Sequence, residues 1–162
     1  MLGPDGTRHA SRHSRTKHLH LRGADGYESA RASAASDATL LHLLDRYGDE
    51  ARSVLALADA YPSLRTPLVA GLPYVKAEAV YAARHEMARS VDDVLSRRTR
   101  ARLLARDASE AAADEVAALL APELGWDARE QLAQAAAYRA LAEHERTSAQ
   151  LPETALEAAI GS

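Results

Sequence analysis

The residues available to fill a core decide the fold class of this chain. Phe is absent, Trp occurs once, and aromatic residues make up only 4% of the 162 positions, although hydrophobic residues make up 47%. Ala, Leu and Val must therefore fill the interior, and these side chains favour close packing between helices over the facing layers of a β-sandwich. We expect an all-α protein.

Helical signals begin at Asp37, which precedes apolar residues on one helical face, and this helix is expected to end at Gly48. A second helix should end before Pro62, a third should cover 74–89, and a fourth, capped by Ser90 and Asp93, should cover 91–105. The next is predicted between an N-cap and a proline stop, and the last is a long helix with an N-cap and an apolar stripe. In the first of these two helices, Ser109 is the expected N-cap and Pro122 the expected stop. In the long helix, Asp127 is the expected N-cap, and the apolar stripe consists of Leu132, Ala135, Ala136, Tyr138 and Leu141. The pattern predicts an irregular bundle of five to six helices.

A basic stretch precedes the helical region. Residues 1–22 contain five Lys and Arg and four of the seven His, with Asp5 as the only acid. The chain length suits one domain. We assign residues 1–35 to a flexible tail and interdomain remnant, 36–150 to a helical C-terminal domain and 151–162 to a frayed tail. The alternating residues 18–21 form a candidate strand remnant.

Composition also limits the function classes. The net charge of −3 and the pI of about 6.2 argue against a nucleic-acid-binding protein. There is no Cys, so neither a disulfide framework nor a thiolate site is expected. No apolar run approaches the roughly 18–20 residues that span a bilayer. We expect a cytoplasmic location, with peripheral contact at the inner membrane face as a further option.

Polar residues are densest between Glu78 and Arg100. On one helix, Glu78, Tyr81, His85 and Arg89 would share a face through steps of three and four residues. Two interpretations remain open. The first is an acid/base pair or anion site in which Glu78 tunes His85, and the second is a hydrogen-bond network that locks this helix to the next.

A metal site is not expected in this region, because Arg89 occupies the second ligand position of the H-E-x-x-H zinc motif. The arginine-rich run from Arg97 to Arg106 could contact phosphate or an acidic partner, or could form an ion-paired helical face with Asp93. The chain contains no G-x-G-x-x-G, Walker or G-x-S-x-G element. We therefore assign no catalytic, cofactor-binding or metal-binding residue.

The same region carries a family resemblance. The string Ala77-Glu78, Tyr81, His85-Glu86, Asp92-Asp93, Leu95, Arg97-Arg98-Thr99-Arg100 resembles the C-terminal domain of FAD-dependent glycerol-3-phosphate dehydrogenases and related glycerophosphate oxidases. The similarity extends to Leu43-Leu44-Asp45-Arg46-Tyr47-Gly48 upstream and Glu123-Leu124-Gly125-Trp126 downstream. Residues 21–27 look like the family's interdomain segment, so the resemblance covers about Ser14 to Arg146.

The resemblance implies a parent enzyme in which a separate flavin domain binds FAD and oxidises glycerol 3-phosphate to dihydroxyacetone phosphate, passing electrons to quinone or oxygen. This chain lacks that domain, so we expect it to bind no cofactor and to be inactive alone. The residues of the motif are expected to pack the helical domain and to dock it on the flavin domain. They are Glu78, Tyr81, His85, Glu86, Asp92, Asp93, Arg97, Arg98 and Thr99.

Two further expectations concern partners. An exposed docking face would promote self-association of the isolated chain. The alternative function is a stand-alone helical interaction module that binds an acidic partner or an anionic membrane surface through the segment from Arg97 to Arg106.

Overall fold

The computed structural model describes residues 19, 24, 26–34 and 36–148. These residues form an all-α fold, as expected, with eight α-helices and no β-strand, apart from an isolated antiparallel bridge between Pro67 and Val75. The helices are α1 (Tyr27–Ser33), α2 (Ala38–Tyr47), α3 (Ala51–Ala60), α4 (Lys76–His85), α5 (Ala101–Leu104), α6 (Arg106–Ala111), α7 (Ala113–Leu124) and α8 (Ala128–Ser148). Two 3₁₀ turns, η2 (Gly48–Glu50) and η3 (Pro62–Arg65), and a π-helical segment, η4 (Asp93–Arg98), complete the fold.

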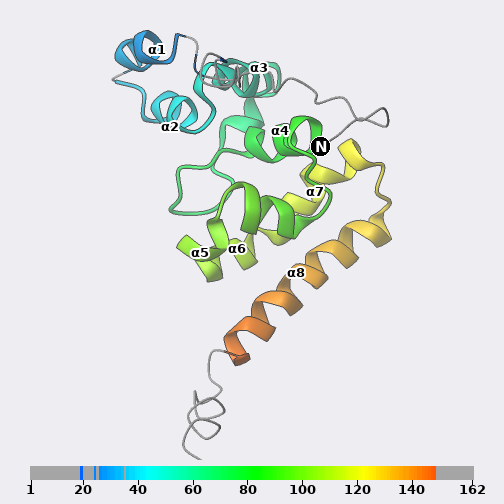
Figure 1. The fold of residues 1–162 in the computed structure, drawn as a ribbon. Coiled ribbons are helices and arrows are strands. Elements are labelled where there is room, and N and C mark those ends of the chain that lie inside the picture. The colour runs from blue at the N-terminus through cyan, green and yellow to red at the C-terminus, as the bar shows by residue number, and fades with distance from the viewer. Residues whose placement is uncertain (1–18, 20–23, 25, 35, 149–162) are drawn as a thin grey trace, which may run out of the picture.

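Helix α4 lies between α1–α3 on one side and α5–α8 on the other (Figure 1), and it contributes to two apolar clusters. Ala79 and Ala82 of α4 belong to a cluster that includes Leu95, Leu120 and Tyr138, and this cluster joins α4 to η4, α7 and α8. A second cluster joins α4 to α1, α2 and α3. Its buried members are Ala34, Leu43, Leu44, Ala51, Val54, Ala58, Leu64, Val75, Ala77, Val80 and Tyr81. Small side chains dominate both clusters, which permits close contact between helices.

Local capping signals were the most reliable guide to the helices. The Asp37 carboxylate accepts a hydrogen bond from Leu40 N at 3.0 Å, and the Asp127 carboxylate accepts one from Glu130 N at 2.7 Å. Gly48 follows α2 with φ 60, a conformation that favours glycine. The predicted starts of α2 and α8 are therefore confirmed, as is the end of α2.

The expected helix over 74–89 is shorter than predicted. Helix α4 ends at His85, and Met87 adopts the left-handed conformation with φ 56. Both Glu86 N and Ala88 N donate to Ala82 O, which closes the turn and buries Ala88. Arg89 therefore lies outside α4.

The expected helix over 91–105 is also interrupted. Thr99 N donates to Val94 O at 2.9 Å, five residues back, as in a π-helix. Arg100 then adopts φ 57, and a new short helix starts at Ala101. The motif sequence therefore forms a π segment and a sharp turn.

Three further expectations were wrong. Ser109 lies inside α6 and does not cap the following helix. Pro122 does not stop α7, because it lies in the last turn, and Gly125 ends the helix with φ 70. Leu132 and Leu141 of the predicted apolar stripe are 69% and 38% exposed, because smaller Ala residues and Tyr138 fill the buried face of α8.

Helix α1 lies within the stretch that we assigned to the tail. The Tyr27 hydroxyl donates to Asp45 Oδ1 at 2.8 Å, and Arg31 Nε donates to the same oxygen at 2.7 Å. These contacts hold α1 against α2. The candidate strand remnant over 18–21 lies outside the described residues, apart from Leu19.

Candidate functional site

Glu78 is the centre of the first polar network. Its side chain is buried in the first turn of α4. One carboxylate oxygen, Oε1, accepts from Val75 N at 2.9 Å and lies 3.0 Å from His42 Nε2. The other, Oε2, accepts from the Tyr47 hydroxyl at 3.1 Å and lies 3.1 Å from Arg46 Nε. The contacts with His42, Arg46 and Tyr47 join α2 to α4, and the contact with Val75 N closes the first turn of α4.

The local sequence explains this geometry. Glu78 is the third residue of α4, so its carboxylate can reach the free backbone N–H at the start of the helix. His42 and Arg46 are four residues apart on α2 and lie on one face, toward Glu78. Burial raises the pKa of the Tyr47 phenol, and the nearby Glu78 charge adds to this effect, so Tyr47 remains a hydrogen-bond donor.

The expected pairing of Glu78 with His85 is wrong. The histidine beside the Glu78 carboxylate is His42, whereas His85 is exposed near the end of α4. The His85 ring packs on the Tyr81 ring, with centroids 4.7 Å apart, and the Tyr81 hydroxyl donates to Glu50 Oε2 at 2.9 Å. The arrangement is a structural network rather than an acid/base pair, but it joins α4 to the preceding helix α2, whereas our second interpretation joined it to the next helix.

Asp93 organises the entry to η4. Ser90 Oγ accepts from Asp93 N at 3.0 Å, as the capping signature predicted, while Asp93 Oδ2 accepts from Arg89 N at 3.0 Å. Burial would raise the pKa of Asp93, but the Arg89 N–H, the Ser90 hydroxyl and the Arg97 guanidinium together hold it below its usual value. The predicted pair between Asp93 and Arg97 is present at 2.7 Å.

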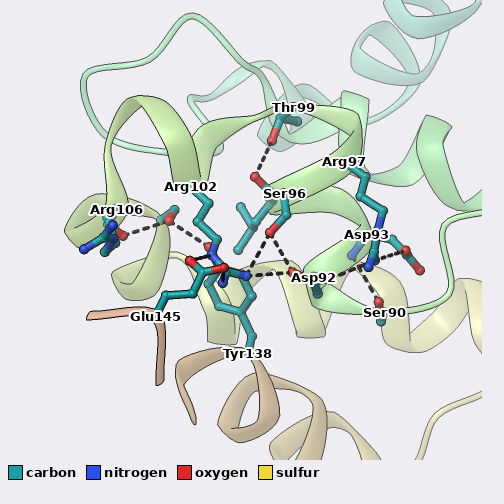
Figure 2. Close-up of polar contacts among 12 residues, drawn as sticks. Ser90, Asp92, Asp93, Ser96, Arg97, Thr99, Arg102, Arg106, Tyr138 and Glu145 are labelled. Carbon is teal, nitrogen blue, oxygen red and sulfur yellow. Dashed lines mark hydrogen bonds and ion pairs between the residues drawn. The ribbon is translucent and has the colours of Figure 1, made fainter. Parts of the chain in front are cut away.

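Arg102 is the centre of the second polar network (Figure 2). Its Nη1 lies 3.1 Å from Asp92 Oδ1, and its Nε donates to Glu145 Oε2 at 2.8 Å. The Asp92 oxygen also accepts from the Ser96 hydroxyl at 2.6 Å. The guanidinium carbon lies 5.8 Å from the centre of the Tyr138 ring. Arg102 therefore joins η4 to α8.

The remaining motif residues hold the turns around η4. The Thr99 hydroxyl is buried and donates to Val94 O at 2.8 Å (Figure 2). Arg98 donates to Glu86 O from Nη2 at 2.6 Å and from Nε at 3.1 Å. Arg98 thereby fixes the backbone turn at Glu86 against the π segment, while the Glu86 carboxylate is half-buried.

The arginine run does not form one basic surface. Arg97 lies 2.8 Å from Asp92 and 2.7 Å from Asp93, and Arg102 is buried among Asp92 and Glu145. Arg98 and Arg100 line a hollow of about 640 Å³. The other residues that line this arginine hollow are Arg46, Tyr47, Tyr74, Glu86, Arg97 and Leu104.

Several features that other kinds of site require are not found among the described residues. Across 26–34 and 36–148, no three His, Asp or Glu side chains cluster as a metal site would require. A Rossmann-type site for a dinucleotide such as FAD is built from a parallel strand followed by a glycine-rich turn and a helix. The same residues contain no strand, so they do not form a site of this type. None of the described helices is both long and apolar enough to cross a membrane.

The sequence comparisons identify the class to which this helical fold belongs. Residues 14–131 match the family described as the C-terminal domain of alpha-glycerophosphate oxidase. The chain belongs to this family. No solved structure matches it.

Among curated relatives, the chain is 38% identical over 146 residues to glycerol-3-phosphate dehydrogenase 2 of Mycobacterium tuberculosis (strain ATCC 25618 / H37Rv), covering 85% of this chain and 25% of the relative. The glycerol-3-phosphate dehydrogenase of Mycobacterium leprae shows the same identity and coverage. A probable mitochondrial glycerol-3-phosphate dehydrogenase of Dictyostelium discoideum is 39% identical over 85 residues, or 52% of this chain and 13% of that relative. The chain thus spans about a quarter of the length of the mycobacterial relatives.

The sequence interpretation missed the partners of both networks. His42, Arg46 and Tyr47 bind Glu78 from α2, and Tyr138 lies beside Arg102 with its hydroxyl 2.8 Å from Ser109 Oγ. The spacing of His42 and Arg46 was a usable signal, because a basic pair on one helix face suits a buried acid. No comparable signal marked the pairing with Tyr138.

Proposed function

We propose that this chain is the helical accessory domain of an FAD-dependent glycerol-3-phosphate dehydrogenase. In the complete enzyme, a flavin domain would oxidise glycerol 3-phosphate to dihydroxyacetone phosphate and pass electrons to quinone. This chain would pack against that domain and supply no reacting group. The observation that carries the proposal is that the motif residues of α4 and η4 are bound to one another and to neighbouring helices in structural networks.

The face that would dock is marked by exposed apolar side chains beside the arginine hollow. Leu104 lines the hollow and is 62% exposed, and Met87, which follows Glu86 of the hollow, is 78% exposed. Exposed apolar groups next to unpaired donors are typical of surfaces that bind another domain. We define Met87 and Leu104, at the edge of the arginine hollow, as the docking face.

A co-expression experiment tests this proposal. The part of the Mycobacterium tuberculosis relative outside the matched segment would be co-expressed with this chain and separated by size exclusion. We expect the two polypeptides to elute together, and Met87→Glu with Leu104→Glu to separate them, whereas Leu132→Glu on α8 should leave the complex intact. Separate elution of the unaltered chain, or equal loss with Leu132→Glu, contradicts the proposal.

Self-association of the chain alone is a consequence of the same exposed face. Analytical ultracentrifugation over a concentration series should show a species larger than the monomer, reduced by Leu104→Glu. The alternative function, a stand-alone module that binds acidic surfaces through the segment from Arg97 to Arg106, has less support. Arg97 and Arg102 are already paired with acidic residues, so that segment offers fewer charges than its sequence indicates.

A further inference from the structure

The arginine hollow contains basic groups that the rest of the chain does not use. Arg98 donates to a backbone carbonyl oxygen, which carries no net charge. Arg100 is exposed, and its side chain makes no hydrogen bond or ion pair with any residue that the structure describes. Two guanidinium groups thus reach the hollow without a carboxylate partner within the described chain.

The third arginine of the hollow is fixed in place. The guanidinium carbon of Arg46 lies 5.1 Å from the centre of the Tyr47 ring and 5.4 Å from that of the Tyr74 ring. The Arg46 Nε lies 3.1 Å from Glu78 Oε2. Stacking and ion pairing on one edge pre-organise the guanidinium, so that a ligand in the hollow would lose little side-chain entropy on meeting it.

The charge balance of the hollow favours an anion. Arg46 is balanced by Glu78, and Arg97 by Asp92 and Asp93. Arg98 and Arg100 then face one acid of the lining, Glu86. The Glu86 Oε2 atom is buried without a hydrogen-bond partner in the described chain, and burial raises the pKa of this carboxyl. The hollow therefore carries an excess of positive charge.

We propose that the arginine hollow binds a phosphate group, which Arg98 and Arg100 hold together with the pre-organised Arg46. A phosphate monoester carries nearly two negative charges near neutral pH and presents three terminal oxygens. It can meet donors that come from α2 and from both sides of the η4 turn, and guanidinium groups match it with paired hydrogen bonds. A carboxylate has two coplanar oxygens and would satisfy fewer of these donors.

The phosphate group could belong to a small phosphate monoester or to the headgroup of an anionic lipid. Both sources present the same chemistry to the hollow. This site goes beyond the proposed accessory role, because binding is a property of the chain alone and is measured without the flavin domain. Its failure would therefore leave the co-expression result unaffected.

The test uses the full chain at constant ionic strength. Inorganic phosphate, glycerol 3-phosphate and acetate are titrated separately, with binding followed by calorimetry and by backbone amide shifts over residues 97–104. Arg100→Gln should weaken phosphate binding about tenfold, because it removes a charge-assisted donor. This exposed side chain has no partner among the described residues, so the variant should keep its circular dichroism spectrum and unfolding temperature. Arg139→Gln, which alters an arginine paired with Asp114, is the matched control and should bind normally.

A second arm distinguishes the source of the phosphate. Vesicles of phosphatidylglycerol are compared with vesicles of phosphatidylcholine in a sedimentation assay. Binding of free phosphate that depends on Arg100 supports a small phosphate monoester, and Arg100-dependent binding to phosphatidylglycerol alone supports a lipid headgroup. Acetate binding as strong as phosphate binding would identify a carboxylate site and overturn the proposal. Absence of binding in both arms, or binding that Arg100→Gln leaves unchanged, would overturn it as well.

Discussion

The two polar networks of this domain are opposites in charge and differ in the exposure of their outer partners. In one, a carboxylate, Glu78, lies among donors from α2 and the start of α4. In the other, a guanidinium, Arg102, lies among the acids Asp92 and Glu145. The two central side chains are almost equally buried, Glu78 at 0% and Arg102 at 6% exposed, but Glu145, an outer partner of Arg102, is 50% exposed. The comparison teaches that the same kind of ion pair should stabilise the fold to very different degrees, according to how much water reaches it.

Glu78→Gln should have the largest effect on stability. The amide cannot balance Arg46, and it cannot accept all the donors that meet the carboxylate. Removing one partner of a buried ion pair costs about 3–5 kcal/mol, and the loss here should lie toward the lower end because Arg46 is 23% exposed. Chemical denaturation of the unaltered chain and the variant would measure the loss of stability. A loss below about 1 kcal/mol would contradict a central role of Glu78 in the fold. Glu123→Gln, which breaks the exposed pair with Arg84, is the control and should cost about 0–1 kcal/mol.

Arg102→Ala should have the next largest effect. It leaves Asp92 without its buried cation and removes the packing on Tyr138, but water can reach Glu145. We expect a loss of about 2 kcal/mol, below that of a fully buried pair. Arg97→Ala removes an exposed partner of the same Asp92 and should cost less than about 1 kcal/mol. Unfolding in urea would measure the loss of stability in the two variants. Equal losses would contradict the expectation that the buried Arg102 contributes more to stability than the exposed Arg97.

Tyr138→Phe should have a smaller effect within the second network. It removes the hydroxyl that lies 2.8 Å from Ser109 Oγ, while Ser109 keeps its hydrogen bond to Arg106 O. The expected loss is about 1 kcal/mol, the net value of one hydrogen bond. Thermal unfolding followed by circular dichroism would measure it. No change in unfolding temperature would mean that this buried contact contributes nothing to stability.

Glu86→Gln should have the smallest effect, and its sign should be reversed. Burial raises the pKa of Glu86 above its value in the unfolded chain, although Arg46 and Arg98 oppose this shift. The ionised carboxyl therefore disfavours the fold at pH values above the folded pKa, and this effect disappears below about pH 4, where both states are protonated. We expect the variant to unfold about 1–3 °C higher at pH 8 and at an unchanged temperature below pH 4. A lower unfolding temperature at pH 8 would contradict this account.

The sequence correctly predicted helix caps and ion pairs between residues that are close together in the chain. Asp37 and Asp127 cap their helices, and Asp93 pairs with Arg97 one turn away, because these contacts need only local geometry. Family resemblance supplied the rest of the correct prediction. It identified the class of domain from the region around α4 and η4, and the comparison with the oxidase domain confirms it.

The sequence did not predict the backbone conformations and residue pairs that depend on tertiary contacts. Met87 and Arg100 adopt left-handed conformations that local propensity disfavours, and the surrounding packing of Ala88 and Ala101 imposes them. The same limit applies to the candidate site. Glu78 meets His42 across 36 residues of sequence, and the split of the arginine run follows from the turn at Arg100.

The central claim is that the flavin chemistry of this enzyme class takes place outside this chain. The most direct measurement is to purify the chain, record its flavin absorbance, and assay glycerol 3-phosphate oxidation with added FAD and an artificial electron acceptor. The account predicts no bound flavin and no turnover. Bound flavin with turnover would contradict it, because helices without a strand-and-helix nucleotide fold would then have built the active site.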